Sequence, residues 1–106
     1  ETLSASLRLL LAGQLGHGET GIDRLARAAG RSRRTLQRQL TAEGTSLAEL
    51  LDELRREEVL RRLTGTREPV ASIAGTVGYR NASSLTRAVR RWTGKSPRAV
   101  RTRGIA

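Results

Sequence analysis

The apolar residues of this chain recur at the three- and four-residue spacing that is typical of amphipathic helices. Leu3, Leu7 and Leu10, for example, predict an opening helix over residues 3–15. Alternating runs typical of strands are few, and the helix-favouring residues Leu, Ala, Arg and Glu dominate. Further helices are predicted over residues 22–29, 32–42, 46–63, 70–77 and 82–93, with a last short helical turn from residue 96. The pattern therefore predicts an all-α fold of about seven helices.

The predicted helix ends are marked by residues that favour them. Ser32 and Asn81 precede helices as N-caps, and Ser46 with Glu49 forms a capping-box pattern. Pro69 stands at the start of a helix, where its fixed φ is favourable. Residues 16–21 are expected to form a loop. Glycines that can end helices stand at Gly30, Gly44, Gly78 and Gly94.

The helix predicted over residues 46–63 changes its apolar face partway along. At ~100° per residue, its leucines near the start cluster on one side, and the apolar residues of its second half lie on roughly the opposite side. The two sets are Leu47, Leu50, Leu51 and Leu54, then Val59, Leu60 and Leu63. A helix that switches its buried face packs against two different partners. We therefore expect a linker helix over residues 46–64 that joins subdomains at residues 1–45 and 65–106.

A short motif occurs twice, at Leu25–Gly30 and at Ile73–Gly78. Each copy is an aliphatic residue, Ala, three variable residues and Gly, and an apolar stripe follows on the next helix. This is the pattern of a helix-turn-helix: the small Ala lets two helices approach closely, and Gly permits a positive φ in the turn. The second turn is one residue longer than the first. A repeat of helical hairpins that binds another protein is the alternative interpretation.

Charge favours a nucleic-acid partner. The chain has 20 basic residues, of which 19 are Arg, against 10 acidic ones, for a net charge of +10. Residues 31–44 carry four Arg and one Glu, and residues 69–106 carry eight basic residues and no acidic one. These basic blocks flank a charge-mixed segment and are typical of nucleic-acid-binding proteins. An Arg-rich composition that merely keeps a small domain soluble is the alternative.

In each copy of the motif, the outer face of the second helix carries groups that can read bases. Arg can hold guanine O6 and N7 in a fork, Gln can do the same for adenine N6 and N7, and Ser and Thr make shorter contacts. Neither face carries an acid that would repel phosphate. Trp92 lies on the apolar side and is interpreted as a core residue. The outward positions are Arg34, Gln37, Arg38 and Thr41, then Ser83, Thr86, Arg87 and Arg90.

The chain resembles the DNA-binding region of the AraC/XylS family of bacterial regulators. The matching stretches are RSRRTLQRQLTAEGTSLAELLDELR at Arg31–Arg55 and IAGTVGYRNASSLTRAVRRWTGKSPRAVR at Ile73–Arg101. The resemblance covers nearly the whole chain, and it implies two helix-turn-helix subdomains joined by a central helix. It also implies a separate effector-binding or dimerising domain ahead of this region in the whole protein.

By the same resemblance, bases are read by Arg34, Gln37 and Arg38 of the first recognition helix and by Ala82, Ser83, Thr86 and Arg87 of the second. The chain departs from the family at apolar positions. Leu47, Leu85 and Val89 stand where Phe is usual, and Val100 stands where Tyr is usual. These departures suggest a thinner second core, and the small Ala82 and Ser83 suggest weaker base reading there.

The sequence thus predicts a sequence-specific DNA-binding domain of a bacterial transcription regulator, with two recognition helices in successive major-groove segments. Its partner is double-stranded DNA, RNA polymerase is a candidate second partner, and we expect a cytoplasmic, nucleoid-associated protein without a membrane span. No cofactor or metal is expected. The predicted DNA-binding residues are Arg31, Arg33, Arg34, Gln37, Arg38, Thr41, Asn81, Ala82, Ser83, Thr86, Arg87 and Arg90.

Two other functions are weighed against this one. Non-specific packaging of nucleic acid would show the same salt dependence but no sequence preference. An enzyme is disfavoured because the chain has no Cys and a single His, His17, in a Gly-flanked loop, so no nucleophile–base pair or metal cluster is evident. The acids between residues 52 and 58 are interpreted as a solvated helix face with Arg partners at i+4.

Overall fold

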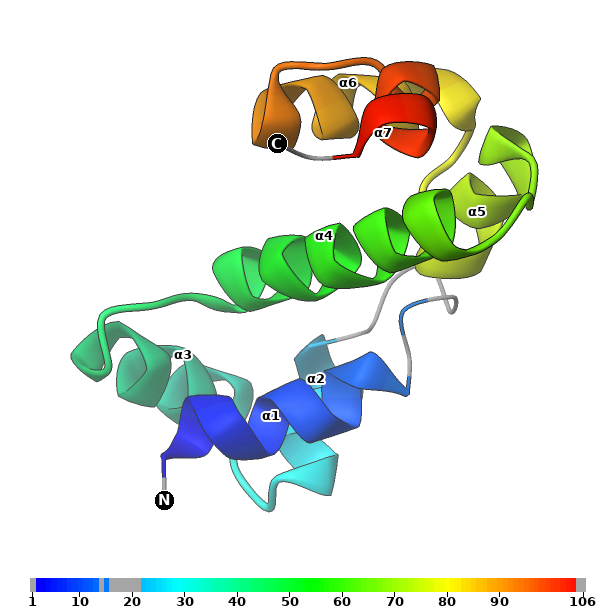
Figure 1. Ribbon diagram of the computed structural model, residues 1–106. Coiled ribbons are helices and arrows are strands. Elements are labelled where there is room, and N and C mark those ends of the chain that lie inside the picture. Colours follow the sequence, from blue (N-terminus) through cyan, green and yellow to red (C-terminus); the bar gives the residue numbers. More distant parts are fainter. Residues whose placement is uncertain (1, 14, 16–21, 105–106) are drawn as a thin grey trace. The chain divides into compact units, whose positions relative to one another are not determined.

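The computed structural model describes residues 2–13, 15 and 22–104, and within these ranges the chain forms seven helices and no strand (Figure 1). The predicted all-α fold is confirmed. The loop predicted over residues 16–21, which contains His17, lies outside the described residues. The helices are α1 Leu3–Ala12, α2 Ile22–Ala28, α3 Arg33–Ala42, α4 Leu47–Gly65, α5 Val70–Val77, α6 Ala82–Thr93 and α7 Pro97–Arg103.

The ends of the helices follow the caps that the sequence provides. The Ser32 Oγ accepts a hydrogen bond from the Thr35 N–H at 3.2 Å, and the Asn81 Oδ1 accepts one from the Ser84 N–H at 2.9 Å. These bonds satisfy N–H groups that the first turn of a helix leaves without an intrahelical partner. Gly78 and Gly94 end α5 and α6 with left-handed φ values of 95° and 74°.

The opening helix is shorter than predicted. It ends at Ala12, and Gly13 follows as its C-cap. The prediction ran to residue 15, and Leu15 does keep the helical spacing of Leu7 and Leu11. Leu15 is indeed buried, with 7% of its surface exposed, but it lies outside the helix. Burial of an apolar residue and membership of a helix are separate properties, and Gly13 is a poor helix former.

The chain divides into two compact units, unit 1 over residues 1–54 and unit 2 over residues 55–106. The boundary falls inside α4, and each part of this helix contributes to a different core. Leu50 and Leu54 are buried in the core of unit 1, whereas Val59 and Leu63 are buried in that of unit 2. The predicted change of buried face along this helix is therefore confirmed.

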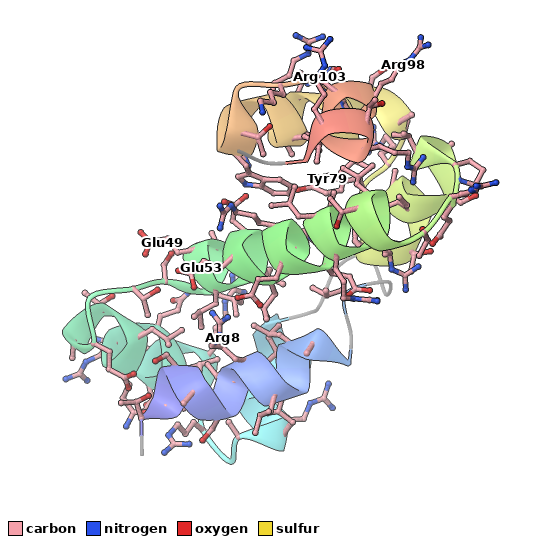
Figure 2. All side chains as sticks on the ribbon, in the orientation of Figure 1. Arg8, Glu49, Glu53, Tyr79, Arg98 and Arg103 are labelled. Carbon is pink, nitrogen blue, oxygen red and sulfur yellow. The ribbon has the colours of Figure 1, made fainter. Side chains whose placement is uncertain are left out.

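Unit 1 is closed by contacts between α1 and the rest of the unit. The Glu43 carboxylate, just beyond α3, accepts hydrogen bonds from the backbone N–H groups of Leu3 at 3.1 Å and Ser4 at 3.0 Å. The bonds from Ser4, and a weaker one from Leu3, hold the pKa of Glu43 below its ordinary value of 4.5. The Arg8 Nη1 on α1 donates to the Glu53 Oε2 on α4 at 2.7 Å (Figure 2). Glu53 thus has a partner from another helix, which the i+4 interpretation did not foresee.

In unit 2, the side chains of Arg62 and Arg101 make polar contacts that join different segments of the chain. Arg62 lies between two carboxylates and contacts Glu58 at 2.6 Å and Glu68 at 2.9 Å. The contact with Glu58 is one of the i+4 pairs that the sequence predicts. On α7, the Arg101 Nε donates to the Leu63 carbonyl oxygen at 3.1 Å, and its Nη2 donates to the Glu68 carbonyl oxygen at 2.6 Å. Arg101 therefore satisfies carbonyl groups near the end of α4 and in the segment that follows it.

Two further results concern function. None of the helices in the described ranges combines the length and apolar composition needed to cross a bilayer. The described residues also contain no group of His, Asp or Glu side chains that could hold a metal ion.

Candidate nucleic-acid interface

The first helix-turn-helix is formed by α2, a tight turn and α3. Ala26 is buried where α2 approaches its neighbours, with 3% of its surface exposed. Gly30 has the positive φ of 68° that the sequence pattern requires, and the Arg31 N–H donates to the Ala26 carbonyl oxygen at 2.8 Å. The Arg31 Nη1 donates to the Ala29 carbonyl oxygen at 2.9 Å, so this predicted DNA-binding residue also stabilises its own turn.

The second helix-turn-helix repeats this geometry with α5 and α6. Ala74 is fully buried, Gly78 has a φ of 95°, and the Tyr79 N–H donates to the Ala74 carbonyl oxygen at 2.8 Å. Each motif therefore closes its turn with the same backbone bond, from the residue after Gly to the motif's Ala. The repeat predicted from two short sequence motifs is a repeat of local structure.

The inner side of α3 is apolar and its outer side is polar. Leu36 and Leu40 are buried in the core of unit 1. The side chains predicted to read bases are exposed and line one shallow hollow of about 410 Å³. Glu43, the acid nearest this helix in sequence, is held by the backbone of α1. The residues that line the hollow are Arg34, Gln37, Arg38, Thr41 and Ala42.

The outer side of α6 is less open. Ser83, Arg87 and Arg90 are exposed, but Ala82 and Thr86 are half-buried. The Arg87 Nη2 donates to the Ser84 hydroxyl at 3.3 Å.

The N-cap residue of α6 and a residue on its inner side have partners within unit 2. Asn81 uses its side-chain oxygen as the N-cap of α6. Trp92 packs against the core of unit 2, with its ring centroid 6.5 Å from that of Tyr79, which agrees with its interpretation as a core residue.

A groove beside α3 was not found from the sequence. It has a volume of about 540 Å³ and lies between α3 and the first turns of α4. Arg33 and Gln37 border it on the side of α3, and Leu47 and Leu51 border it on the side of α4. Leu47 is the position at which the resemblance leads one to expect Phe, and the smaller side chain fills less of the space between the two helices. That departure is a signal for a hollow, but the predicted place was the second core, whereas Leu47 packs against the core of unit 1.

Comparison with known proteins agrees with this geometry. A family model described as a helix-turn-helix domain matches residues 25–103. The ornithine utilization regulator of Pseudomonas aeruginosa is 38% identical over 76 residues, which are 72% of this chain and 22% of the relative. The HTH-type transcriptional regulator VirS of Mycobacterium tuberculosis is 41% identical over 71 residues, which are 67% of this chain and 21% of the relative. The chain thus spans about a fifth of the length of these curated relatives.

Solved structures show the same architecture. The DNA-binding domain of the transcriptional factor AdpA, solved in complex with a target DNA, is 27% identical with a TM-score of 0.79, and the match covers 96% of this chain and 92% of that one. The C-terminal domain of AraT, a response regulator from Geobacillus stearothermophilus, is 26% identical with a TM-score of 0.84, covering 100% and 89%. A transcriptional dual regulator from Escherichia coli K-12 has a TM-score of 0.89 at 22% identity, covers 97% and 98%, and shares the fold.

Proposed function

Because this chain belongs to the AraC-type family of helix-turn-helix DNA-binding domains, we propose that it reads a specific DNA sequence within a bacterial transcription regulator, through residues of both α3 and α6. The proposal rests on one observation above all. On each of these helices an apolar side is buried in a core, while the opposite side presents exposed Arg with Gln, Thr or Ser and no acid. That combination favours contact with base edges and phosphates.

On α3, the proposed base-reading residues are Arg34, Gln37 and Arg38. Their exposure and their common hollow favour bidentate contacts to purines in the major groove. Arg31, in the turn before this helix, and Arg33, its first residue, are assigned to phosphates. Thr41 makes a shorter contact at the far end of the face.

On α6, Arg87 is the proposed main base-reading residue and Arg90 is assigned to phosphate. Ser83 and the half-buried Ala82 and Thr86 have little reach. The side-chain oxygen of Asn81 caps the helix, and its side-chain N–H group would donate to the phosphate backbone of DNA. We therefore propose that α6 contributes more to affinity than to sequence preference.

We also propose that one protomer occupies two successive major-groove segments. The α4 helix has 19 residues, which makes it about 28 Å long at ~1.5 Å per residue. Successive major-groove segments on one face are ~34 Å apart, so a helix of this length can join two reading units. The two motifs are direct repeats in one chain, so the site is expected to be non-palindromic.

Selection of bound DNA from a random library tests this function. We expect a recovered motif with two different half-elements about one helical turn apart. Insertion of five base pairs between them would place one half-element on the opposite face of the duplex, and affinity should fall to that of a single unit. Unchanged affinity for the spaced site would contradict the two-segment arrangement. Equal affinity for all sequences with a steep salt dependence would favour packaging instead.

We propose further that the regulator works in the bacterial cytoplasm, in association with the nucleoid, and that this domain has no catalytic role. The membership of the chain in a family of DNA-binding regulators supports both statements. The effector-binding or dimerising domain would lie in the rest of the regulator, and RNA polymerase is a candidate partner of the bound protein.

A further inference from the structure

The last carbonyl of α5 has a partner from a different helix. The Arg55 Nε on α4 donates to the Val77 carbonyl oxygen at 3.0 Å. Val77 is the final residue of α5, and the carbonyl groups in the last turn of a helix lack intrahelical partners. Gly78 follows with a left-handed φ, which turns the chain towards α6. Arg55 thus binds the second helix-turn-helix at the end of its first helix, where the turn begins.

The same guanidinium also contacts the residue after this glycine. The Arg55 Cζ lies 5.5 Å from the centroid of the Tyr79 ring, within the range of a cation–π contact. The Tyr79 ring in turn lies 6.5 Å from that of Trp92, which is part of α6. Arg55 is therefore joined to α6 by two successive side-chain contacts, in addition to its bond to the end of α5.

The corresponding carbonyl of the first motif is satisfied in another way. Ala29 occupies the position that Val77 occupies in the second motif, and its carbonyl accepts a hydrogen bond from Arg31, two residues along the chain. The second turn is one residue longer, and its partner Arg55 comes from 22 residues away. The first turn is thus closed by a local arginine and the second by an arginine on α4.

We infer that Arg55 is a positioning residue for the second recognition helix: it sets the angle at which α6 leaves the turn, and hence the fit of α6 to its half-element. This inference rests on the proposed function. Arg suits the role because its planar guanidinium can donate from Nε while its face lies against a ring, which the single ammonium of Lys cannot do. Arg55 itself touches no base in this assignment.

The test uses four variants of the whole chain, each with a single substitution. Arg55→Ala removes both contacts, and Arg55→Lys keeps the charge without the planar guanidinium. Arg56→Ala is the matched control, an exposed arginine at the next position of α4. Val59→Ala is a second control, because it lowers the stability of unit 2 from its buried core and leaves Arg55 unchanged. All variants are studied at a temperature well below their unfolding midpoints. Amide chemical shifts report the structure around α6, and hydroxyl-radical footprinting reports which half-elements of the selected DNA site are protected.

Arg55→Ala is expected to shift the amide signals of Tyr79 and α6, to abolish protection of the half-element read by α6, and to lower affinity for the full site about tenfold, while protection by α3 persists. Arg55→Lys should recover part of the affinity. Arg56→Ala should stay within about twofold of the parent chain.

Two outcomes would overturn the inference. One is unchanged signals in α6 of Arg55→Ala with both half-elements still protected. The other is loss of the same protection in Val59→Ala, because stability alone would then explain the effect. Failure of the proposed function looks different: the parent chain itself would protect no second half-element, whereas the chemical shifts would still report whether Arg55 positions α6.

Discussion

The two units contain the same helix-turn-helix motif but support it differently. Unit 1 encloses it in a core made of Leu and Ala, and a carboxylate, Glu43, satisfies N–H groups at the start of α1. Unit 2 has a core rich in Val and Leu with Tyr79 and Trp92 at its edge. Two arginines, Arg55 and Arg101, satisfy carbonyl groups at or near helix ends. A negative group near a helix N-terminus and a positive group near a C-terminus are both favourable. The two units therefore use charges of opposite sign at opposite ends of their helices.

The two reading faces also differ. Gln37 and Arg38 on α3 are exposed, whereas Thr86 on α6 is half-buried and Ala82 has no polar side-chain group. We expect unit 1 to supply most of the sequence preference and unit 2 to supply more of the general affinity.

The largest effects are expected from the cores. Leu36 and Leu85 are equivalent positions, and both are fully buried. Truncation of either to Ala should cost ~2–5 kcal/mol of unfolding free energy, because it removes buried methyl groups and leaves a cavity. Hydrogen exchange should show the loss in the unit that carries the substitution. If Leu36→Ala lowered the protection of unit 2 as strongly as that of unit 1, the two units would not be separately stable.

Base reading comes next. Arg38→Ala and Gln37→Ala should each cost ~1–3 kcal/mol of binding to the selected site and relax its sequence preference. Arg87→Ala, at the position equivalent to Arg38, should relax the preference less. Binding to the selected site and to a scrambled one, measured side by side, checks this. Should Gln37→Ala bind both as the parent does, the assignment of α3 as the main reading helix is wrong.

Phosphate contact gives a smaller and different effect. Arg90→Ala should weaken binding to all sequences about equally. It should also reduce the steepness with which the logarithm of the binding constant falls with the logarithm of the salt concentration by ~0.9, because one fewer phosphate is neutralised. Titrations at several salt concentrations measure the slope. A change in sequence preference without a change in slope would move Arg90 from the phosphate class to the base-reading class.

The smallest effect concerns Glu43 and depends on pH. Hydrogen bonds from Ser4 hold its folded-state pKa below the ordinary 4.5. The stabilisation is therefore fully present above about pH 4.5 and is lost as the pH falls through the lowered value. Glu43→Gln should be less stable than the parent at neutral pH, and the difference should vanish in acid. Urea unfolding of both proteins from pH 7 downwards checks this. A pH-independent difference would mean that the carboxylate charge contributes nothing.

Much of the fold was predictable because its determinants are local. The caps at Ser32 and Asn81 act within three residues, and the glycines after α5 and α6 permit a backbone conformation that other residues rarely adopt. The division of α4 between two cores follows from its own apolar spacing. Leu15 marks where local inference failed, because its spacing continued past a glycine that ends the helix.

What the sequence determined by itself was the set of helices, the repeat and the residues on the outer faces of α3 and α6. The tertiary structure decided which charged groups close each unit. Glu43 reaches α1 across about 40 residues, and Arg55 and Arg101 reach carbonyl groups 22 to 38 residues away. The sequence holds many other Arg and Glu residues that could serve equally well by charge. Only packing fixes which of them comes within hydrogen-bond distance of a helix end, because that distance depends on how the helices meet and not on any local pattern.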